Sequence, residues 1–480
     1  MGIIKSVDGK CQKTDVIIFG AGPSGLAGAD KLIRNNKEVL IFEKDKQVGG
    51  ISKTIKFKSC YFDLGGHRFF TKSKEVNDLW NRTLGDNFLN RPRLSRIYYK
   101  NKFFNYPIKP INALVGLGVI NAIKILVSYL KIKIFPYKEE KTFEHWVSNR
   151  FGKKLYNTFF KTYTEKLWGI PCSQIQAEWA AQRIKGLSLL TAVKNAIIPN
   201  KNGTVKTLIN EFKYPKYGPG MMYEQMAQNI EKAGGDILME QEVIKIKYDD
   251  FIIKSVVTRD KNNNEAEYCA DNFLSSMPIT TLVKSLSPAV PQEVLEAAGN
   301  LTYRSFITIS VILNSPNPFP DTWIYVHSPE VKMGRIQNFK SWSPFMVSNK
   351  NQIALGLEYF CTEGDDLWNM KDTDLIKLGL KELEKIKLGK GEDFVSGFVA
   401  RVSKAYPVYD TNYKKHIEVV KKYLSKFKNI QPIGRYGMFK YNNMDHSILT
   451  GIYAAENILG KNNNIWAVNA DKEYHEEKGK

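Results

Sequence analysis

The feature that most constrains this chain is a glycine-rich turn between a predicted strand and a predicted helix. Residues 16–19 (Val-Ile-Ile-Phe) predict a buried strand, and the next residues read Gly20-Ala-Gly22-Pro23-Ser24-Gly25. A helix is expected up to about Arg34, and a second strand, residues 39–42, ends on Glu43. Strand, tight turn, helix and strand in this order predict a βαβ unit that binds a nucleotide.

Each part of this unit has a defined role in binding a dinucleotide. Gly20 permits the turn, Gly22 lets backbone N–H groups approach a pyrophosphate at the helix N-terminus, and Gly25 lets the helix pack closely on the strand. The carboxylate of Glu43 is placed to accept hydrogen bonds from ribose hydroxyl groups. The cofactor residues predicted from this unit are Gly20, Gly22, Pro23, Ser24, Gly25, Glu43 and Lys44.

Length, charge and cysteine content narrow the class of protein. The chain has 480 residues, 43% hydrophobic and 25% charged, which is typical of a globular protein with several domains. The net charge is +21, but the basic residues are scattered along the chain, which argues against nucleic-acid binding. Five widely spaced cysteines without a C-x-x-C pair argue against a disulfide framework and a zinc site. We therefore expect no bound metal and a reducing, cytoplasmic location.

The hydrophobic pattern changes along the chain, and this predicts three domains. No apolar run reaches 18 residues, so no integral membrane span is expected. Helical periodicity dominates from about Ser73 to Pro199, and strand patterns return after Asp236. A C-terminal helix is expected from Ser447 to Leu459, after Asp445 as its cap. We predict a discontinuous nucleotide-binding domain (1–72, 205–290 and 425–480), a helical insert (73–204) and a mixed-sheet substrate domain (291–424).

One part of the predicted helical insert has two interpretations. In residues 111–135, Asn121, Lys124, Ser128 and Lys131 form one polar stripe on an otherwise apolar segment. A helix of this kind either packs against the rest of the protein or lies on a membrane surface, where basic residues would contact anionic lipids. Packing is the preferred interpretation, and peripheral membrane contact stays open.

Two glycine pairs follow the βαβ unit, at Gly49-Gly50 and at Gly65-Gly66-His67, where the backbone must pass close to a flat or bulky group. Together with the βαβ unit they resemble the FAD-binding superfamily of amine oxidases, protoporphyrinogen oxidase, phytoene desaturases and UDP-galactopyranose mutases. The chain is most similar to the eukaryotic-type mutases and their mutase-like or protoporphyrinogen-oxidase-like bacterial relatives. The likeness is carried by Tyr106-Pro107, Leu167-Trp168-Gly169-Ile170-Pro171, Trp323-Ile324-Tyr325, Gly334-Arg335, Ala405-Tyr406-Pro407, Gly434-Arg435-Tyr436-Gly437 and the segment from Tyr441 to Ser447.

This resemblance implies an α/β fold with a discontinuous FAD-binding Rossmann-like domain of the GR2 type. It implies FAD as the cofactor, active in its reduced form, with NAD(P)H only as a reductant. The further cofactor residues implied are Gly49, Gly50, Gly65, Gly66, His67, Val243, Arg435, Asp445, His446 and Ser447, and the implied catalytic residues are His67, Arg335 and Arg435. The implied substrate residues are Tyr106, Lys109, Lys161, Trp168, Tyr325, Arg335, Tyr406, Tyr441 and Asn443.

The substrate-binding residues agree in kind with a nucleotide sugar, which needs cations for two phosphates and an aromatic group for its base. Arg335 matches a pyrophosphate-binding arginine of the mutases, and Tyr325 matches an aromatic residue of the nucleotide pocket. The chain also departs from the mutases: Lys161 replaces a second pyrophosphate arginine, and Lys109 replaces a polar amide. The identity of the sugar and of the nucleotide therefore stays open.

Three functions are compatible with these motifs. The first is an isomerase in which N5 of reduced FAD attacks the anomeric carbon of a UDP-sugar, so that pyranose and furanose forms interconvert. The second is an oxidoreductase of the amine oxidase, protoporphyrinogen oxidase or desaturase kind, in which the substrate gives a hydride to FAD. The third is a flavin-stabilised binding or membrane-surface protein without turnover. The phosphate-binding chemistry of the predicted cleft favours the first, and the sequence does not indicate an oligomeric state.

Overall fold

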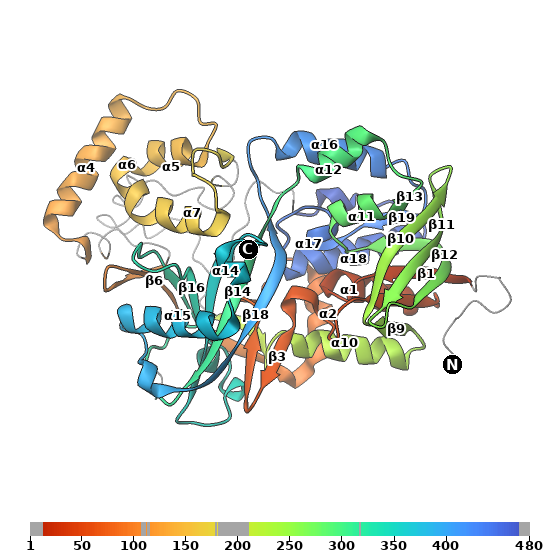
Figure 1. The fold of residues 1–480 in the computed structure, drawn as a ribbon, viewed down its shortest axis with the longest axis horizontal. Coiled ribbons are helices and arrows are strands. Elements are labelled where there is room, and N and C mark those ends of the chain that lie inside the picture. The colour runs from red at the N-terminus through yellow and green to blue at the C-terminus, as the bar shows by residue number, and fades with distance from the viewer. Residues whose placement is uncertain are drawn as a thin grey trace.

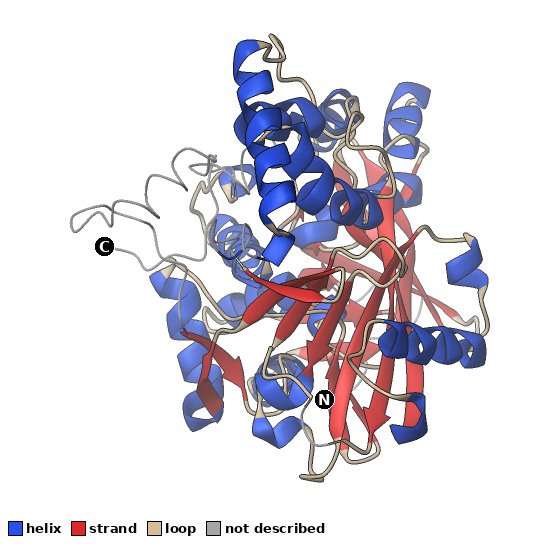
Figure 2. Ribbon diagram, turned by 90° about the vertical axis from the view of Figure 1, so that its left-hand side faces the viewer, coloured by secondary structure: helices blue, strands red, loops and turns tan. Residues whose placement is uncertain are grey.

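The computed structural model describes residues 13–106, 112, 116–177, 180, 211–315 and 318–469. Two large β-sheets lie beside each other, and helices cover both of them (Figures 1 and 2). The first sheet contains the βαβ unit, and the second contributes Tyr325, Arg335, Glu358 and Tyr406 to the candidate site. Among the described residues, no helix is long and apolar enough to span a membrane.

The first sheet has eight strands in the order β13-β10-β11-β12-β1-β2-β9, with β19 added beside β12. Strands β19, β12, β1, β2 and β9 run parallel to one another. The central strand is β1, and its residues Val16, Ile17 and Ile18 are fully buried, as expected for a parallel strand covered on both faces. The bounds are β1 Lys13–Phe19, β2 Val39–Glu43, β9 Asp236–Met239, β10 Gln241–Asp249, β11 Ile252–Asp260, β12 Glu265–Ser275, β13 Leu286–Ser287 and β19 Ile430–Pro432.

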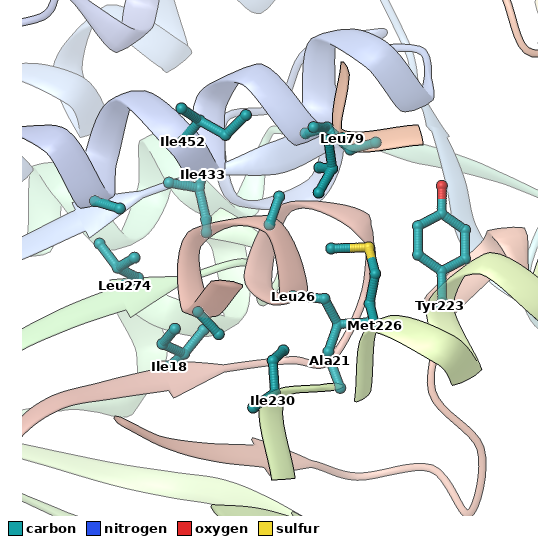
Figure 3. Close-up of a cluster of buried hydrophobic side chains, with 14 of the residues drawn as sticks. Ile18, Ala21, Leu26, Leu79, Tyr223, Met226, Ile230, Leu274, Ile433 and Ile452 are labelled. Atoms are coloured by element: carbon teal, nitrogen blue, oxygen red, sulfur yellow. The ribbon is translucent and has the colours of Figure 1, made fainter. Parts of the chain in front are cut away.

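Side chains alternate across β1 and pack into two separate cores. Ile18 joins Leu26 and Ile452 in the core under helices α1 (Pro23–Ile33), α2 (Lys74–Leu84), α10 (Gly220–Lys232) and α18 (Met444–Ile458), as Figure 3 shows. Ile17 packs on the opposite face, under α11 (Ile279–Ser285), α12 (Gln292–Gly299) and α16 (Tyr413–Leu424). The nucleotide-binding turn is therefore held between two packed layers.

Helices α1 and α18 approach each other at glycine residues. A Cβ atom on Gly451 of α18 would lie 2.0 Å from the carbonyl oxygen of Ser24 in α1, and a Cβ on Gly28 would lie 3.2 Å from the carbonyl oxygen of Gly451. Only glycine permits so close an approach of two backbones. This contact brings the C-terminal helix against the helix that follows the nucleotide-binding turn.

The second sheet has seven strands in the order β18-β14-β17-β16-β15-β6-β7. Helix α15 (Asp372–Lys385) covers one face, where it packs with Leu357 and Tyr359 of β17. On the opposite face of β17, Phe360 packs with Phe306 and Tyr406. The bounds are β6 Ser95–Tyr99, β7 Lys102–Asn105, β14 Tyr303–Leu313, β15 Trp323–Val326, β16 Arg335–Asn338, β17 Ile353–Cys361 and β18 Phe394–Pro407.

A group of helices extends beyond the second sheet at the left of Figure 1. It consists of α4 (Val119–Ile134), α5 (Phe143–Phe151), α6 (Lys153–Leu155), a π-helical turn η3 (Tyr156–Lys161) and α7 (Thr162–Trp168). The remaining described strands form two small antiparallel pairs, β3 (Thr54–Phe57) with β4 (Cys60–Asp63) and β5 (Phe88–Pro92) with β8 (Glu211–Pro215).

The fold class predicted from the sequence is confirmed: the chain is α/β, with a nucleotide-binding sheet assembled from distant segments and a second mixed sheet. The expectation that residues 73–204 are helical is wrong for β5, β6 and β7. Strands β6 and β7 form a hairpin around Lys100 and Asn101, which both have positive φ values (49° and 59°), and aromatic residues such as Tyr98 and Phe103 favour strands there. The cysteine pattern also missed one bond: Cys269 is disulfide-bonded, whereas Cys60, Cys172 and Cys361 are free and buried.

Candidate active site

The turn after β1 has the geometry of an anion-binding site. Gly22 is the N-cap of α1, and no side chain caps this end of the helix. The first N–H groups of an uncapped helix attract anions, because they have no partner within the helix and the helix dipole is positive there. Beside them, the buried carboxylate of Glu43 accepts hydrogen bonds from the backbone N–H groups of Ala21 (2.8 Å) and Asp45 (2.9 Å). Burial raises the pKa of Glu43, although both hydrogen bonds favour its ionised form.

The glycines of this turn have two different functions. A Cβ on Gly20 would lie 2.3 Å from Oγ of Ser276, and one on Gly25 would lie 2.0 Å from the carbonyl oxygen of Gly20, so both glycines are needed for packing. A Cβ on Gly22 would have nothing nearer than the Cα of Gly50, at 4.0 Å. Gly22 and Gly50 therefore border open space at the uncapped end of α1, and this space fits the pyrophosphate of a dinucleotide.

Two further predicted cofactor residues lie after β2 and in β10. Lys44 is exposed directly after β2. Val243 is buried in β10, where the pairing with β11 shifts its register between Val243 and Lys245. Strand β9 pairs with β2, and Met239 of β9 is the partner of Glu43. Because β10 follows β9 directly in the chain, Val243 lies a few residues after this partner.

The second glycine pair, Gly65-Gly66, contacts the second sheet. Gly65 has a φ of 89° and leaves room for a Cβ, whereas a Cβ on Gly66 would lie 2.2 Å from the ring of Trp323. His67 follows and makes a hydrogen bond through Nε2 with the carbonyl oxygen of Leu64 (3.0 Å). Burial, reinforced by the positive charges of Arg435 and Arg335, lowers the pKa of His67 to about 4, so its ring is neutral at neutral pH.

Helix α17 (Gly434–Gly437) brings Arg435 close to the nucleotide-binding turn. Gly434 has a φ of 77°, and a Cβ on it would lie 2.5 Å from Oγ of Ser24. The guanidinium group of Arg435 donates hydrogen bonds to the carbonyl oxygens of Asn442 (2.8 Å) and Ala405 (3.2 Å). It lies over the ring of Tyr441, 4.9 Å from the centroid, so it connects the cofactor side of the site with the aromatic side.

The start of α18 differs from the prediction. Asp445 was expected to cap a helix beginning at Ser447, but the helix begins at Met444 and its N-cap is Asn443. Asn443 has an extended conformation, and it forms a reciprocal capping box with His446, whose Nδ1 accepts a hydrogen bond from the backbone N–H of Asn443 (3.3 Å). Asp445 and Ser447 are buried in the first turn. Asn443 and His446 thus have a structural role at this helix end.

A buried ion pair lies at the centre of the second sheet. Nε of Arg335 is 2.7 Å from Oε2 of Glu358, and Nη2 of Arg335 donates a hydrogen bond to the hydroxyl of Tyr406 (2.7 Å). Gln337 donates a hydrogen bond to the other oxygen of Glu358 (2.6 Å). Burial raises the pKa of Glu358, and Arg335 opposes this rise. The guanidinium also lies over the ring of Phe360, 4.6 Å from the centroid.

Aromatic side chains surround this ion pair and connect most of the predicted substrate residues. Tyr406 and Tyr441 stack with 5.5 Å between their ring centroids, and Trp168 lies 6.4 Å from Tyr441. Tyr325 lies 4.7 Å from Tyr106. The site therefore brings together His67, Arg335, Arg435, Tyr106, Trp168, Tyr325, Tyr406 and Tyr441.

Among the described residues, the predicted substrate residues Lys161 and Asn443 are not part of this group, and two of its members were missed. Lys161 is exposed at the end of η3, and Lys109 lies outside the described residues, as does Pro107. Tyr163, whose ring lies 5.6 Å from that of Tyr325, and Glu358 were not predicted. Glu358 had a signal in the sequence, since it is the one acidic residue in the apolar run of residues 353–361. Among the described residues, no three potential metal ligands lie together.

Comparison with known proteins identifies the family. Residues 23–459 match the family model described as flavin containing amine oxidoreductase. The chain belongs to this family. FAD is therefore its cofactor, and the uncapped end of α1, the open space at Gly22 and Gly50, and the carboxylate of Glu43 fit its pyrophosphate and ribose.

Individual relatives have different activities. A UDP-galactopyranose mutase of Mycoplasma genitalium is 27% identical over 180 residues, which cover 36% of this chain and 43% of that protein. An all-trans-retinol 13,14-reductase of Danio rerio is 27% identical over 274 residues, which cover 50% of this chain and 43% of that protein. This chain thus aligns with less than half the length of either relative.

Solved structures resemble the whole chain more closely in fold than in sequence. A reduced UDP-galactopyranose mutase has a TM-score of 0.82 at 21% identity, covering 95% of this chain and 96% of the other. A protein from Exiguobacterium sp. 255-15, assigned provisionally as a protoporphyrinogen oxidase, has a TM-score of 0.71 at 17% identity, and the match covers 94% of this chain and 100% of the other. A putrescine oxidase has a TM-score of 0.62 at 14% identity, and the match covers 94% of this chain and 100% of the other. The protein is a flavin-dependent enzyme of this fold.

Proposed function

We propose that this enzyme is a UDP-sugar mutase-like isomerase, which interconverts pyranose and furanose forms of a nucleotide sugar without net oxidation. The observation that carries the proposal is the charge of the candidate active site. Arg335 is paired with Glu358, whereas Arg435 has no carboxylate within ion-pair distance among the described residues and donates to two backbone carbonyls. The site is therefore net positive, which favours an anionic substrate such as a diphosphate.

The residues around the two arginines suit the parts of a nucleoside diphosphate sugar. The hydroxyl groups of Tyr406 and Tyr441 would donate hydrogen bonds to phosphate oxygens, and the exposed Lys161 would add a positive charge without the bidentate geometry of arginine. Tyr325 and the partly exposed Tyr106 would stack on the base. Trp168 would close the pocket beside Tyr441.

On the cofactor side, the protein would position and stabilise the flavin. When bound and reduced, FAD supplies a nucleophilic N5 for the anomeric carbon. The N-terminus of α18 would stabilise negative charge at the pyrimidine end of the ring through its helix dipole. His67, neutral because of its low pKa, would add no positive charge there and would hold the backbone at Leu64.

The second candidate is an oxidoreductase that takes a hydride from its substrate to FAD. The stacked rings of Tyr406 and Tyr441 favour it, because parallel aromatic faces also accept apolar groups or a cationic amine. An ammonium group against either ring would, however, lie close to the guanidinium group of Arg435, which is 5.7 Å from the Tyr406 centroid and 4.9 Å from the Tyr441 centroid. This repulsion disfavours an amine substrate and leaves apolar substrates as the main alternative.

Binding of UDP to the FAD-loaded protein tests the proposal. We expect UDP to perturb the flavin absorption spectrum and to bind with a measurable dissociation constant, whereas a diamine such as putrescine produces neither effect. Arg435→Ala should weaken UDP binding by about tenfold or more, because a charge-assisted contact with phosphate is lost. Arg401→Ala is the matched control, since Arg401 pairs with Asp372 on the side of α15. Tight putrescine binding without UDP binding would refute the proposal.

A further inference from the structure

Helix α4 carries an exposed apolar face that the enzymatic function does not explain. Thirteen large hydrophobic residues are exposed among the described residues, and eight of them lie in residues 119–135. Their exposed fractions are 75% for Val119, 71% for Ile120, 57% for Ile123, 54% for Leu126, 60% for Val127, 53% for Leu130, 70% for Ile134 and 71% for Phe135. A contiguous patch of this kind marks an interaction surface.

Helix α4 buries only a narrow strip of its surface and exposes most of its apolar residues. Its inward face is formed by Ile125 and Tyr129, which are 3% exposed, together with Ser128, whose hydroxyl accepts a hydrogen bond from the backbone N–H of Lys154 (2.9 Å). A Cβ on Gly152 would lie 2.9 Å from the backbone nitrogen of Tyr129, so this face is tightly packed. The sequence favoured packing of the apolar face, but the structure directs that face outward.

Lysine residues border the exposed apolar face on both sides. Positions 119, 123, 126, 130 and 134 follow the three- and four-residue spacing of one helix face, and 120 and 127 adjoin them. The same geometry places Lys124 and Lys131 along one edge of this face and Lys133 along the other. No acidic residue occurs from 87 to 138, where the sequence has ten lysine or arginine residues.

A pocket behind α4 extends this positive charge. Asn121 and Ile125 of α4 line it together with Lys100, Lys102 and Lys154. None of the described residues that line it is acidic. Ammonium groups in such a position suit the phosphate groups of lipid headgroups, which lie next to the acyl chains that an apolar face would contact.

We propose that α4 binds the enzyme to an anionic phospholipid membrane, with its apolar face inserted at the level where headgroups meet acyl chains. Eight exposed apolar side chains on and just after α4 suit a flat lipid surface, because this helix lies at the outer edge of the molecule (Figure 1). Long lysine side chains at the borders of the face can extend to the headgroups. A second copy of this chain is disfavoured, because a symmetric interface would place these lysines opposite one another.

Co-sedimentation of the FAD-loaded protein with lipid vesicles tests this proposal. We expect strong binding to phosphatidylcholine vesicles that contain about 30% phosphatidylserine, and weaker binding to phosphatidylcholine alone or at high salt. The triple variant Ile123→Ser, Val127→Ser and Leu130→Ser should lower the partition coefficient at least about tenfold. Replacing Lys124 and Lys131 by alanine should lower it for the anionic vesicles only.

Matched controls separate this effect from a general loss of surface residues. Phe394→Ser with Val395→Ser removes two exposed apolar residues elsewhere, and Lys254→Ala with Lys381→Ala removes two exposed charges; both should bind vesicles like the parent protein. Retained FAD shows that each variant is folded. A parent protein that does not bind anionic vesicles, or a triple variant that binds as well as the parent, would overturn the proposal. The proposal would also be overturned if the parent protein is a dimer that does not bind vesicles and the triple variant is a monomer.

Discussion

Arg335 and Glu358 are direct partners across strands β16 and β17, and their side chains form an ion pair of 2.7 Å in which both groups are buried. Ile336 and Leu357, the next pair along, are also cross-strand partners and are buried in the core under α15. The alternation of side chains in a strand thus places the charged pair on the face that carries Tyr406 and Phe360.

The first prediction concerns this ion pair. Arg335→Ala leaves a buried carboxylate without its partner, so the free energy of unfolding should fall by about 3–5 kcal/mol. Denaturant unfolding measures the change. Adding Glu358→Gln should restore part of the lost stability, because an amide is neutral. Equal stability of the single variant and the parent protein would show that the pair is not buried as described.

The second prediction separates the two kinds of glycine in the nucleotide-binding turn. Gly22→Ala places a methyl group in open space, so the protein should fold but retain little FAD. Gly25→Ala places one 2.0 Å from a carbonyl oxygen, so the protein itself should be destabilised. Thermal unfolding of the FAD-free forms, with the FAD content of the purified proteins, distinguishes the two. If Gly22→Ala retains FAD like the parent, the space at Gly22 is not the pyrophosphate site.

The third prediction concerns the carboxylate at the end of β2. Glu43→Ala removes the acceptor for the N–H groups of Ala21 and Asp45, and with it the carboxylate that we expect to bind the ribose of FAD. Retention of FAD should weaken by roughly 1.5–3 kcal/mol, measured as the dissociation constant after removal and re-addition of the cofactor. Glu38→Ala is the control, since the side chain of Glu38 is exposed and lies directly before β2, at the opposite end of this strand from Glu43. Equal loss in both variants would contradict the role of Glu43.

The fourth prediction follows from the low pKa of His67, about 4 in the folded protein. An unfolded histidine has a pKa near 6.5, so between these values the unfolded state binds more protons and folding stability falls as pH falls. At pH above about 6.5 this contribution is constant. His67→Gln should therefore lose less stability than the parent between about pH 6.5 and 4, by at most about 1.4 kcal/mol per pH unit. Identical pH profiles of unfolding would contradict the lowered pKa of His67.

Local patterns predicted the cofactor half of the site. Strand, glycine turn and terminal acid lie within a single βαβ unit, so Gly22 and Glu43 come together whatever the rest of the chain does. Glu358 could not be predicted, because its contact with Arg335 depends on the pairing of β16 with β17 in one register. The capping role of Asn443 was missed because Asp445 is an equally good cap by residue type, and only the position of α18 against α1 decides between them.

Helix α4 shows a further limit of sequence patterns. Periodicity identifies two faces of different polarity, but it does not say which face the protein covers. The close contact at Gly152 and the hydrogen bond of Ser128 fix the face that carries Ile125, Ser128 and Tyr129 inward. Such contacts depend on α5 and α6, which lie later in the chain.

Turnover of UDP-sugars by the reduced and the oxidised enzyme, compared without oxygen, tests the central claim most directly. If the enzyme is a mutase, a dithionite-reduced sample should interconvert the pyranose and furanose forms of one UDP-sugar, with the flavin spectrum unchanged after many turnovers. The oxidised sample should be inactive. Bleaching of the oxidised flavin by an amine, a porphyrinogen or a polyene, with oxygen consumed in air and no response of the reduced enzyme to any UDP-sugar, would contradict the account.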